Sequence, residues 1–316
     1  MNPKPSANRA AKTILASMGI SIILGLILFI GYIFVRSLPA FYISPNPVNK
    51  VDWTSIPRPV VTNPNWRSWT TANKVNDALW INDLVWVATK GGVSVQAISQ
   101  EEHVKFLPEH GLPSGNVTAI TSDASGRIWV GTRDSGVARY DGLQWETFRG
   151  REQIPSDQIN DIYAAQNGVV WAATNQGLAR FDGNTWSNVR FSLFDISNPR
   201  VTGVVGQGND VWVATNEGVY YFNGSDWLFY GLNEGVINEF ILDITISPDR
   251  SVWVATPSGI GQFDGLRWNR FTVKDGLPDL PATQILAAPD KTVWITFEDL
   301  SAPEFSQTVR FDGFAP

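Results

Sequence analysis

The sequence repeats itself with a period of about 41 residues. The pattern Val-Trp-Val-Ala-Thr and its variants recurs at spacings of 43, 42, 41, 41 and 41 residues, with its tryptophan at Trp86, Trp129, Trp171, Trp212, Trp253 and Trp294. Most units continue with a glycine, a short apolar run, Phe-Asp-Gly or a close variant, and a second tryptophan, at Trp145, Trp186, Trp227 and Trp268. A fixed period near 40 residues is typical of propellers and solenoids.

Each unit contains the pattern of four short strands. In the second unit, alternating apolar residues predict strands over 117–123, 128–133, 137–141 and 144–148, with Gly or Asp-Gly at the reversals. The many β-branched and aromatic residues exclude the helical repeat families of similar period. Four antiparallel strands per repeat predict one propeller blade, and the periodic tryptophans are expected to fill the core between blades.

Six units predict a closed six-bladed β-propeller, an all-β fold. The last unit ends at Pro316, before a fourth strand, whereas Asn65-Trp66-Arg67-Ser68-Trp69 has the aromatic spacing of a fourth strand. We therefore expect residues 65–70 to complete the blade formed by residues 284–312. Such closure removes exposed strand edges.

An uncharged run over residues 13–35, between Lys12 and Arg36, is long enough to predict a transmembrane helix ahead of the propeller. A secretory signal cleaved near Ala40 is the alternative. Because Lys4, Arg9 and Lys12 precede the run, residues 1–12 are expected in the cytoplasm. Residues 36–63 are rich in proline and predict a stalk, which places the propeller, residues 64–316, outside the cytoplasm.

Small residues lie four apart on one face of the expected helix, at Ser17, Ser21 and Gly25. This spacing predicts a contact with another transmembrane helix, although small residues are also common in such helices without a partner.

Composition excludes several functions. The chain has no Cys and two His, which excludes thiol catalysis and disulfides and leaves little room for histidine-based chemistry. Residues 1–36 hold four basic residues and no acidic one, so the rest has 20 basic against 30 acidic residues. Nucleic acid is therefore not an expected partner.

The block over residues 111–142, G-L-P-S-G-N-V-T-A-I-T-S-D-A-S-G-R-I-W-V-G-T-R-D-S-G-V-A-R-Y-D-G, closely resembles the two-component-regulator propeller repeat. The resemblance extends over roughly residues 65 to 313. It implies an extracytoplasmic sensor region, as in membrane histidine kinases. No kinase, receiver or DNA-binding segment follows the repeats, so we expect any signal to pass through a separate protein.

Candidate catalytic residues are few. His110 is a lone histidine in a loop, and His103 takes the place of a second tryptophan. Repeated aspartates such as Asp141 begin Asp-Gly turns of different blades and do not converge. Near the channel axis, the sequence predicts Asp161, Asp243 and Gln284, which either bind a cation or polar ligand or simply line a water-filled tunnel. No catalytic residue, metal site or cofactor is predicted.

The last unit carries about seven extra residues between its second and third strands. Insertions on one rim of a repeat protein often mark a binding face. The connections between blades, with Phe191, Tyr230, Phe240 and Leu280, should share that rim. Acidic and aromatic side chains there predict a protein partner, bound by Glu298, Asp299, Glu304, Phe305 and Phe194.

These features predict a single-pass membrane protein whose propeller binds and does not catalyse. The expected partner is a membrane protein or membrane complex, of which the chain is an accessory subunit or a sensor adaptor. Two alternatives remain: a propeller lyase or hydrolase with a channel site, and a sensor domain for a small ligand.

Overall fold

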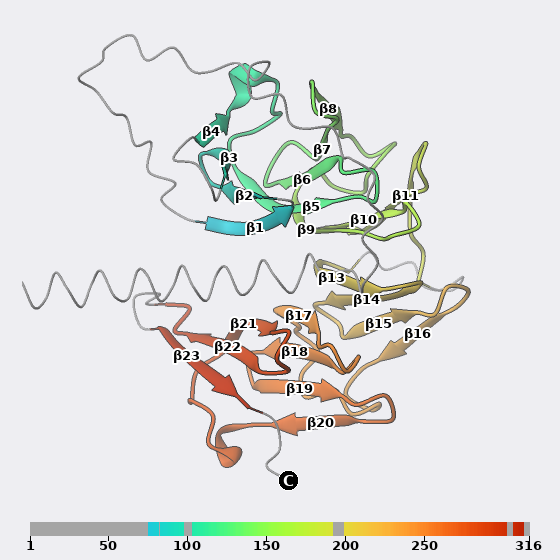
Figure 1. Ribbon diagram of the computed structural model, residues 1–316. Helices are drawn as coiled ribbons and strands as arrows, with labels where there is room; N and C mark the ends of the chain where they lie inside the picture. Colours follow the sequence, from blue (N-terminus) through green and yellow to red (C-terminus); the bar gives the residue numbers. More distant parts are fainter. Residues whose placement is uncertain (1–74, 82, 98–102, 192–198, 302–305, 313–316) are drawn as a thin grey trace, which may run out of the picture.

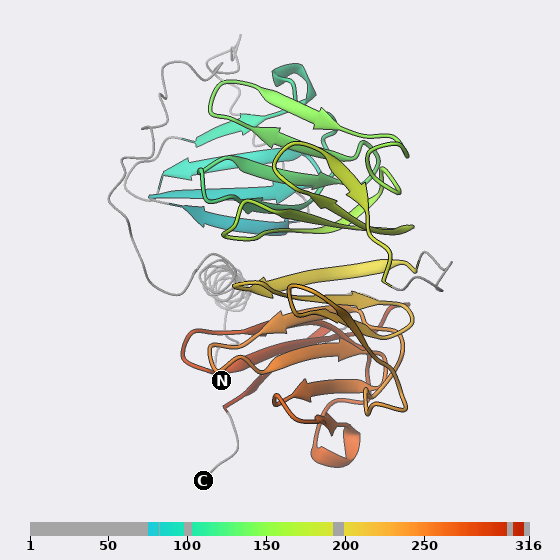
Figure 2. The same ribbon diagram turned by 90° about the vertical axis from the view of Figure 1, so that its right-hand side faces the viewer.

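A computed structural model describes residues 75–81, 83–97, 103–191, 199–301 and 306–312. In this part of the chain, 23 strands form six antiparallel sheets, the blades of a six-bladed β-propeller. Blades 1–3 occupy the upper half of Figure 1 and blades 4–6 the lower half, with the first strand of each blade toward the middle. Figure 2 shows the same blades from the side.

Each blade is a meander of consecutive strands. Blades 1–3 contain β1 (Val75–Ile81), β2 (Leu84–Thr89), β3 (Gly92–Ala97), β4 (His103–Phe106), β5 (Val117–Ser122), β6 (Ile128–Thr132), β7 (Val137–Tyr140), β8 (Trp145–Phe148), β9 (Ile159–Ala164), β10 (Val170–Thr174), β11 (Gly177–Phe181) and β12 (Trp186–Asn188). The strands predicted for blade 2 are confirmed to within one residue at each end.

Blades 4–6 contain β13 (Val201–Gln207), β14 (Asp210–Thr215), β15 (Val219–Phe222), β16 (Trp227–Tyr230), β17 (Asp243–Ile246), β18 (Val252–Thr256), β19 (Gly259–Phe263), β20 (Trp268–Phe271), β21 (Ala282–Ala287), β22 (Val293–Glu298) and β23 (Ser306–Phe311). Two single-turn 3₁₀ helices, η1 (Pro108–His110) and η2 (Val273–Asp275), lie between blades.

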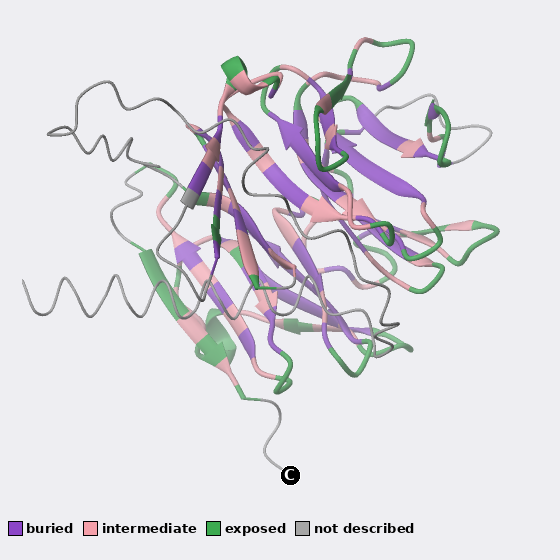
Figure 3. Cartoon of the chain, turned by 45° about the horizontal axis from the view of Figure 1, so that its top comes forward, coloured by how far each residue is buried: buried purple, intermediate pink, exposed green. Residues whose placement is uncertain are grey.

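The meander gives the propeller two faces. Turns between first and second strands, and between third and fourth strands, form what we call the hairpin face. Turns between second and third strands, and the connections between blades, form the connection face. In Figure 3 the strands near the middle are mostly buried, and the exposed residues gather in turns and outer strands.

A threonine ends the second strand of blades 1–5 and fixes the next turn. In blade 2, the Thr132 hydroxyl donates to the Gly136 carbonyl at 2.8 Å. Gly136 has φ 77°, and a Cβ there would lie 2.3 Å from the Phe148 carbonyl oxygen, so only glycine fits. This explains the recurrent threonine and glycine of the repeat.

Aromatic side chains fill the spaces between blades, as the periodic tryptophans predict. Between blades 2 and 3, Trp129 is fully buried, with ring centroids 5.7 Å from Phe148, 5.2 Å from Phe181 and 6.1 Å from Trp186. Equivalent clusters lie between the other consecutive blades from 1 to 6. Each blade therefore shares its core with the next one.

No helix in the described part of the chain is long and apolar enough to cross a membrane. The helix expected over residues 13–35, the stalk and the closing strand at residues 65–70 all lie outside the described residues. Ser17, Ser21 and Gly25 lie outside them as well.

Candidate functional site

First strands from all six blades line one central cavity of about 160 Å³. Each blade contributes one or two lining residues: Asn76 and Asp77, Thr118 and Ala119, Asn160 and Asp161, Thr202, Leu242 and Asp243, and Thr283 and Gln284. The cavity therefore opens at the point where the six first strands begin. It brings together the three residues that the sequence predicts near the axis.

β-Bulges turn polar side chains of the first strands toward the neighbouring blade. The pairing of first and second strands shifts at Asn76, Thr118, Asn160, Thr202 and Thr283. Thr118 Oγ1 donates to the Ile159 carbonyl at 2.8 Å, and Asn160 Nδ2 donates to the Val201 carbonyl at 2.7 Å. Asn76 and Thr202 make the equivalent bonds to Val117 and Ile241. Four such bonds tie blades 1 to 5 together.

Aspartates on alternate blades add a second set of bonds. Asp161 is 4% exposed, and its two carboxylate oxygens accept the N–H groups of Ile162, in its own blade, and Val204, in the next blade, at 2.8 and 2.9 Å. Asp77 bonds Ala78 and Ile120 in the same way, and Asp243 bonds Ile244 and Ile285. We call these three residues the clamp aspartates.

Two of the predicted channel residues, Asp161 and Asp243, are clamp aspartates and therefore help to hold neighbouring blades together. Asp161 is buried, and its two oxygens accept main-chain N–H groups of two blades. Gln284 differs, since its side chain is exposed. Among the described residues, no group of three His, Cys, Asp or Glu side chains lies close enough to hold a metal ion.

A second, polar cleft of about 340 Å³ lies on the connection face between blades 2 and 3. Its lining residues are Asp134, Arg151, Pro155, Ser156, Asp157, Gln158 and Gln176. Gln158 accepts a hydrogen bond from Asn175, whose Oδ1 accepts from Asn160 of the central cavity at 2.9 Å. A chain of amide side chains thus links the cleft to the cavity.

Exposed apolar side chains gather on another part of the connection face. We define the 4–6 rim as residues 215–218, 231–242, 256–258, 272–281 and 298–301. It carries the exposed side chains of Leu232, Phe240 (57% exposed), Val273 and Leu300 (64% exposed). The other half of the connection face has no large apolar side chain of that exposure among its described residues. We call this half the 1–3 rim and define it as residues 89–92, 107–116, 132–136, 149–158, 174–177, 189–191 and 199–200.

The structure places the other predicted rim residues individually. Glu298 and Asp299 are half-buried at the end of β22, where Glu298 N–H donates to the Pro281 carbonyl of the preceding connection. Phe194, Glu304 and Phe305 lie outside the described residues. Phe191 lies in the connection between blades 3 and 4, as expected, but its ring stacks on Tyr220 at 4.1 Å and is buried, so it is not part of the exposed rim surface.

His110 has a local role in the connection between blades 1 and 2. Its Nδ1 accepts the N–H of Leu107 at 3.1 Å, which holds the η1 turn. His103 begins β4 opposite Gln96, where blade 2 pairs Tyr140 with Trp145, so it occupies the second-tryptophan position as predicted.

Residues 111–134 match the family model described as two component regulator propeller. The chain contains a two-component-regulator propeller repeat. No curated protein matches the sequence.

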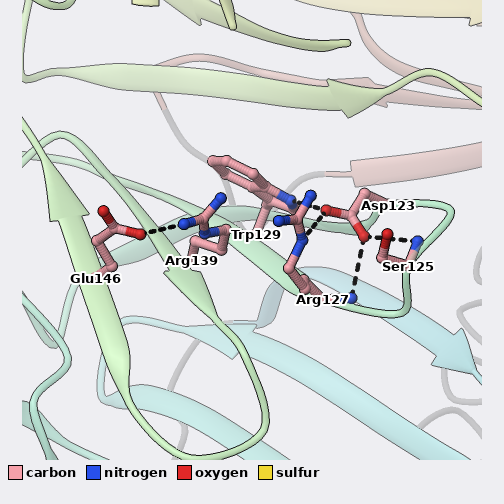
Figure 4. Close-up of polar contacts among 6 residues, drawn as sticks. All are labelled: Asp123, Ser125, Arg127, Trp129, Arg139 and Glu146. Carbon is pink, nitrogen blue, oxygen red and sulfur yellow. Dashed lines mark hydrogen bonds and ion pairs between the residues drawn. The ribbon is translucent and has the colours of Figure 1, made fainter. Parts of the chain in front are cut away.

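The matched repeat contains a buried polar cluster on the hairpin face (Figure 4). Asp123 Oδ1 accepts the N–H groups of Ser125 and Arg127, and its Oδ2 accepts Arg127 Nε at 2.7 Å and Trp129 Nε1 at 2.8 Å. Arg139 pairs with Glu146, with its guanidinium 5.3 Å from the Trp129 ring centroid. The repeat motif therefore positions a core tryptophan and identifies the fold, not a ligand.

Solved structures share the propeller fold at low identity. The extracellular domain of the putative hybrid two-component system BT3049 from B. thetaiotaomicron is 20% identical, with a TM-score of 0.58 over 71% of this chain and 32% of that chain. Selenomethionine-substituted virginiamycin B lyase from Staphylococcus aureus is 13% identical, with a TM-score of 0.58 over 75% of this chain and 84% of that chain.

PorZ, a surface component of the type-IX secretion system of Porphyromonas gingivalis, is 16% identical, with a TM-score of 0.52 over 72% of this chain and 39% of that chain. This chain spans about a third of the length of the B. thetaiotaomicron domains. The propeller fold is thus common to extracellular domains of putative two-component systems, a secretion-system component and enzymes, and function depends on the site.

Proposed function

We propose that this chain is a non-enzymatic protein-interaction module that the segment 13–35 holds at a membrane, with its propeller outside the cytoplasm. It serves as an accessory subunit of a membrane complex or as a sensor adaptor. One observation carries the proposal: among the described residues of the connection face, the strongly exposed large apolar side chains all belong to the 4–6 rim. Clustered apolar side chains on a soluble surface favour a protein partner.

The comparisons support this role by analogy of fold. Extracellular domains of B. thetaiotaomicron sensor systems and a secretion-system surface component are built on the same propeller. The alternative of a lyase or hydrolase has a counterpart in virginiamycin B lyase. The predicted channel residues Asp161 and Asp243 favour it less, because both carboxylates bind main-chain N–H groups.

The test is purification of the tagged full chain from its native membrane in mild detergent, followed by mass and composition analysis. A stoichiometric complex is expected. Phe240→Ser combined with Leu300→Ser should release the partner. Leu143→Ser combined with Leu266→Ser, which changes two exposed leucines of the hairpin face, should not. Recovery of the unaltered chain as a lone monomer would overturn the proposal.

A small-ligand sensor is the second candidate, and the cavity shared by all six blades favours it. A ligand there would contact every blade and raise the melting temperature in a saturable way. Gln284→Trp should fill the cavity and abolish that rise. If no solute in a screen gives such a rise, this candidate fails.

A further inference from the structure

The charged residues of the 4–6 rim are almost all acidic. Its one basic residue is Lys274, whereas its acidic residues are Glu217, Glu234, Glu239, Asp275, Asp279, Glu298 and Asp299. All of these except the half-buried Glu298 and Asp299 are exposed. Arg270 lies beside the rim on β20, and its guanidinium donates to the carbonyls of Leu232 and Gly235.

The acidic and apolar groups are interleaved along one surface. At blade 4, a Cβ on Gly231 would lie 2.9 Å from the Phe229 ring and 3.3 Å from the Glu234 carboxylate, so ring and carboxylate flank the same glycine. A Cβ on Gly218 would also touch the Phe229 ring, at 2.8 Å, next to Glu217. Phe229 is 44% exposed.

Hydrogen bonds continue this surface across blades 5 and 6. Phe240 N–H donates to Asn238, and Asn238 Nδ2 donates to the Ser258 hydroxyl in the next turn of the rim. Glu298 N–H bonds the Pro281 carbonyl, which joins the turn of blade 6 to the connection before it. Side-chain and main-chain hydrogen bonds therefore join neighbouring segments of the 4–6 rim.

The other half of the connection face has the opposite character. Basic residues outnumber acidic ones on the 1–3 rim: Lys90, Arg133, Arg149, Arg151, Arg190 and Arg200 stand against Glu109, Asp134, Glu152 and Asp157. The polar cleft with Arg151 lies in this half. The 4–6 rim is thus acidic and carries exposed apolar side chains, whereas the 1–3 rim has more basic than acidic residues and carries none of that exposure.

We propose that the 4–6 rim docks a cationic segment of a partner protein, one whose Lys or Arg residues alternate with apolar side chains. This proposal rests on the proposed function and names the chemistry of its partner. Apolar side chains of the segment cover Phe229, Leu232, Phe240 and Leu300, while its cations meet the carboxylates between them.

The acidic charge of the 4–6 rim favours a cationic segment of a partner protein over a second copy of this chain and over an anionic lipid surface. A second copy that presents its own 4–6 rim brings like charges together, and one that presents its 1–3 rim covers the apolar residues with a polar, charged surface. An anionic lipid surface is repelled by the same carboxylates. A cationic, apolar partner satisfies both features of the surface.

The test uses the full chain and three 12-residue peptides, which alternate Lys with Leu, Lys with Ser, and Glu with Leu. The Lys–Leu peptide should bind at least tenfold more tightly than the Lys–Ser peptide, and the Glu–Leu peptide should not bind. Glu217→Lys with Glu239→Lys should weaken Lys–Leu binding at least tenfold. Asp83→Lys with Asp226→Lys makes the same charge change on the hairpin face and should leave it within twofold.

Equal weakening by both pairs of substitutions, or equal binding of the Lys–Leu and Lys–Ser peptides, would overturn the inference. The native-membrane purification separates it from the proposed function. If the Glu217→Lys, Glu239→Lys chain keeps a stoichiometric partner, the proposed function stands and the cationic chemistry is wrong. If the unaltered chain has no partner, the proposed function itself fails, and a complex of two copies of this chain contradicts the inference.

Discussion

Asp161 of blade 3 accepts the main-chain N–H of Val204 in blade 4 at 2.9 Å, across the boundary between two sheets. The same carboxylate accepts Ile162 N–H within blade 3. Asp77 and Asp243 repeat the arrangement two blades away on either side. The ring is therefore joined near its axis by carboxylates as well as by aromatic packing.

Asp161→Ala should destabilise the propeller. It leaves two buried N–H groups without an acceptor, each at a cost of roughly 1–3 kcal/mol, so we expect a loss of about 2–6 kcal/mol in the free energy of unfolding. Urea denaturation measures it. Glu217→Ala, an exposed acid of the 4–6 rim, should change stability by less than about 0.5 kcal/mol. Unchanged stability of the Asp161→Ala chain would instead favour a ligand-binding role for this carboxylate.

Asp123→Ala should also cost stability, because Asp123 holds the Trp129 indole and three other N–H donors in a buried site. We expect a loss of about 3–5 kcal/mol. Blade 5 provides the comparison, since Ser247 Oγ alone accepts Trp253 Nε1 at 2.9 Å. Ser247→Ala should cost about 1 kcal/mol. Equal losses in the two variants would mean that the carboxylate adds nothing beyond one hydrogen bond.

The repeat in the sequence was sufficient to predict the blades, because Trp129 and its counterparts recur every 41 residues or so, and those of blades 1–5 each fill one space between blades. The clamp aspartates alternate with a period of two blades, which a search for a single-blade period does not detect. A signal was present, since Asn76-Asp77 and Asn160-Asp161 alternate with Thr118-Ala119 and Thr202-Gly203.

Burial of individual side chains on the connection face could not be read from the pattern. Phe191 and Phe240 both lie in connections between blades, yet Phe191 is buried on Tyr220 whereas Phe240 is exposed. Which of the two contacts solvent depends on the path of the connection, and that path does not follow the repeat. The division of the face into acidic and basic halves became visible only once the turns were placed together.

The turns between third and fourth strands predict a specific response to acid. Hydrogen bonds from main-chain N–H groups, such as those of Gln144 and Leu143 to Asp141, hold the pKa of Asp141, Asp182 and Asp264 below the ordinary aspartate value. The folded chain thus binds these protons less readily than the unfolded chain. The stabilisation is present above about pH 4 and is lost as the pH falls through the lowered pKa values.

Replacement of Asp141, Asp182 and Asp264 by Asn should flatten this decline. Blade 4 already uses Asn223, which accepts the N–H groups of Ser225 and Asp226 without a charge. We expect a lower free energy of unfolding of the triple variant near pH 7, because Asn lacks the charge that strengthens these hydrogen bonds, and a shallower fall in that free energy from about pH 5 to about pH 2.5. The control is replacement by Asn of Asp83, Asp134 and Asp279, which lie outside these turns. This control should leave the fall in the free energy of unfolding between about pH 5 and about pH 2.5 as steep as in the unaltered chain. In the first triple variant, a decline as steep as that of the unaltered chain would contradict the prediction.

Closure of the ring by residues 65–70 predicts one strand register. Blade 2 pairs Tyr140 with Trp145 and Ala138 with Thr147, and blade 5 pairs its strands alike, so Phe311 should lie opposite Trp66 and Val309 opposite Ser68. Because the chain has no Cys, Ser68→Cys with Val309→Cys tests this without background thiols. We expect a disulfide on mild oxidation and a higher melting temperature, whereas Ser68→Cys with Val137→Cys, on blade 2, should stay reduced.

Trp66→Ala with Trp69→Ala should lower the free energy of unfolding by several kcal/mol, roughly the cost of truncating two buried aromatic side chains. Free thiols in the Ser68→Cys, Val309→Cys chain, together with unchanged melting of the Trp66→Ala, Trp69→Ala chain, would show that another segment closes blade 6.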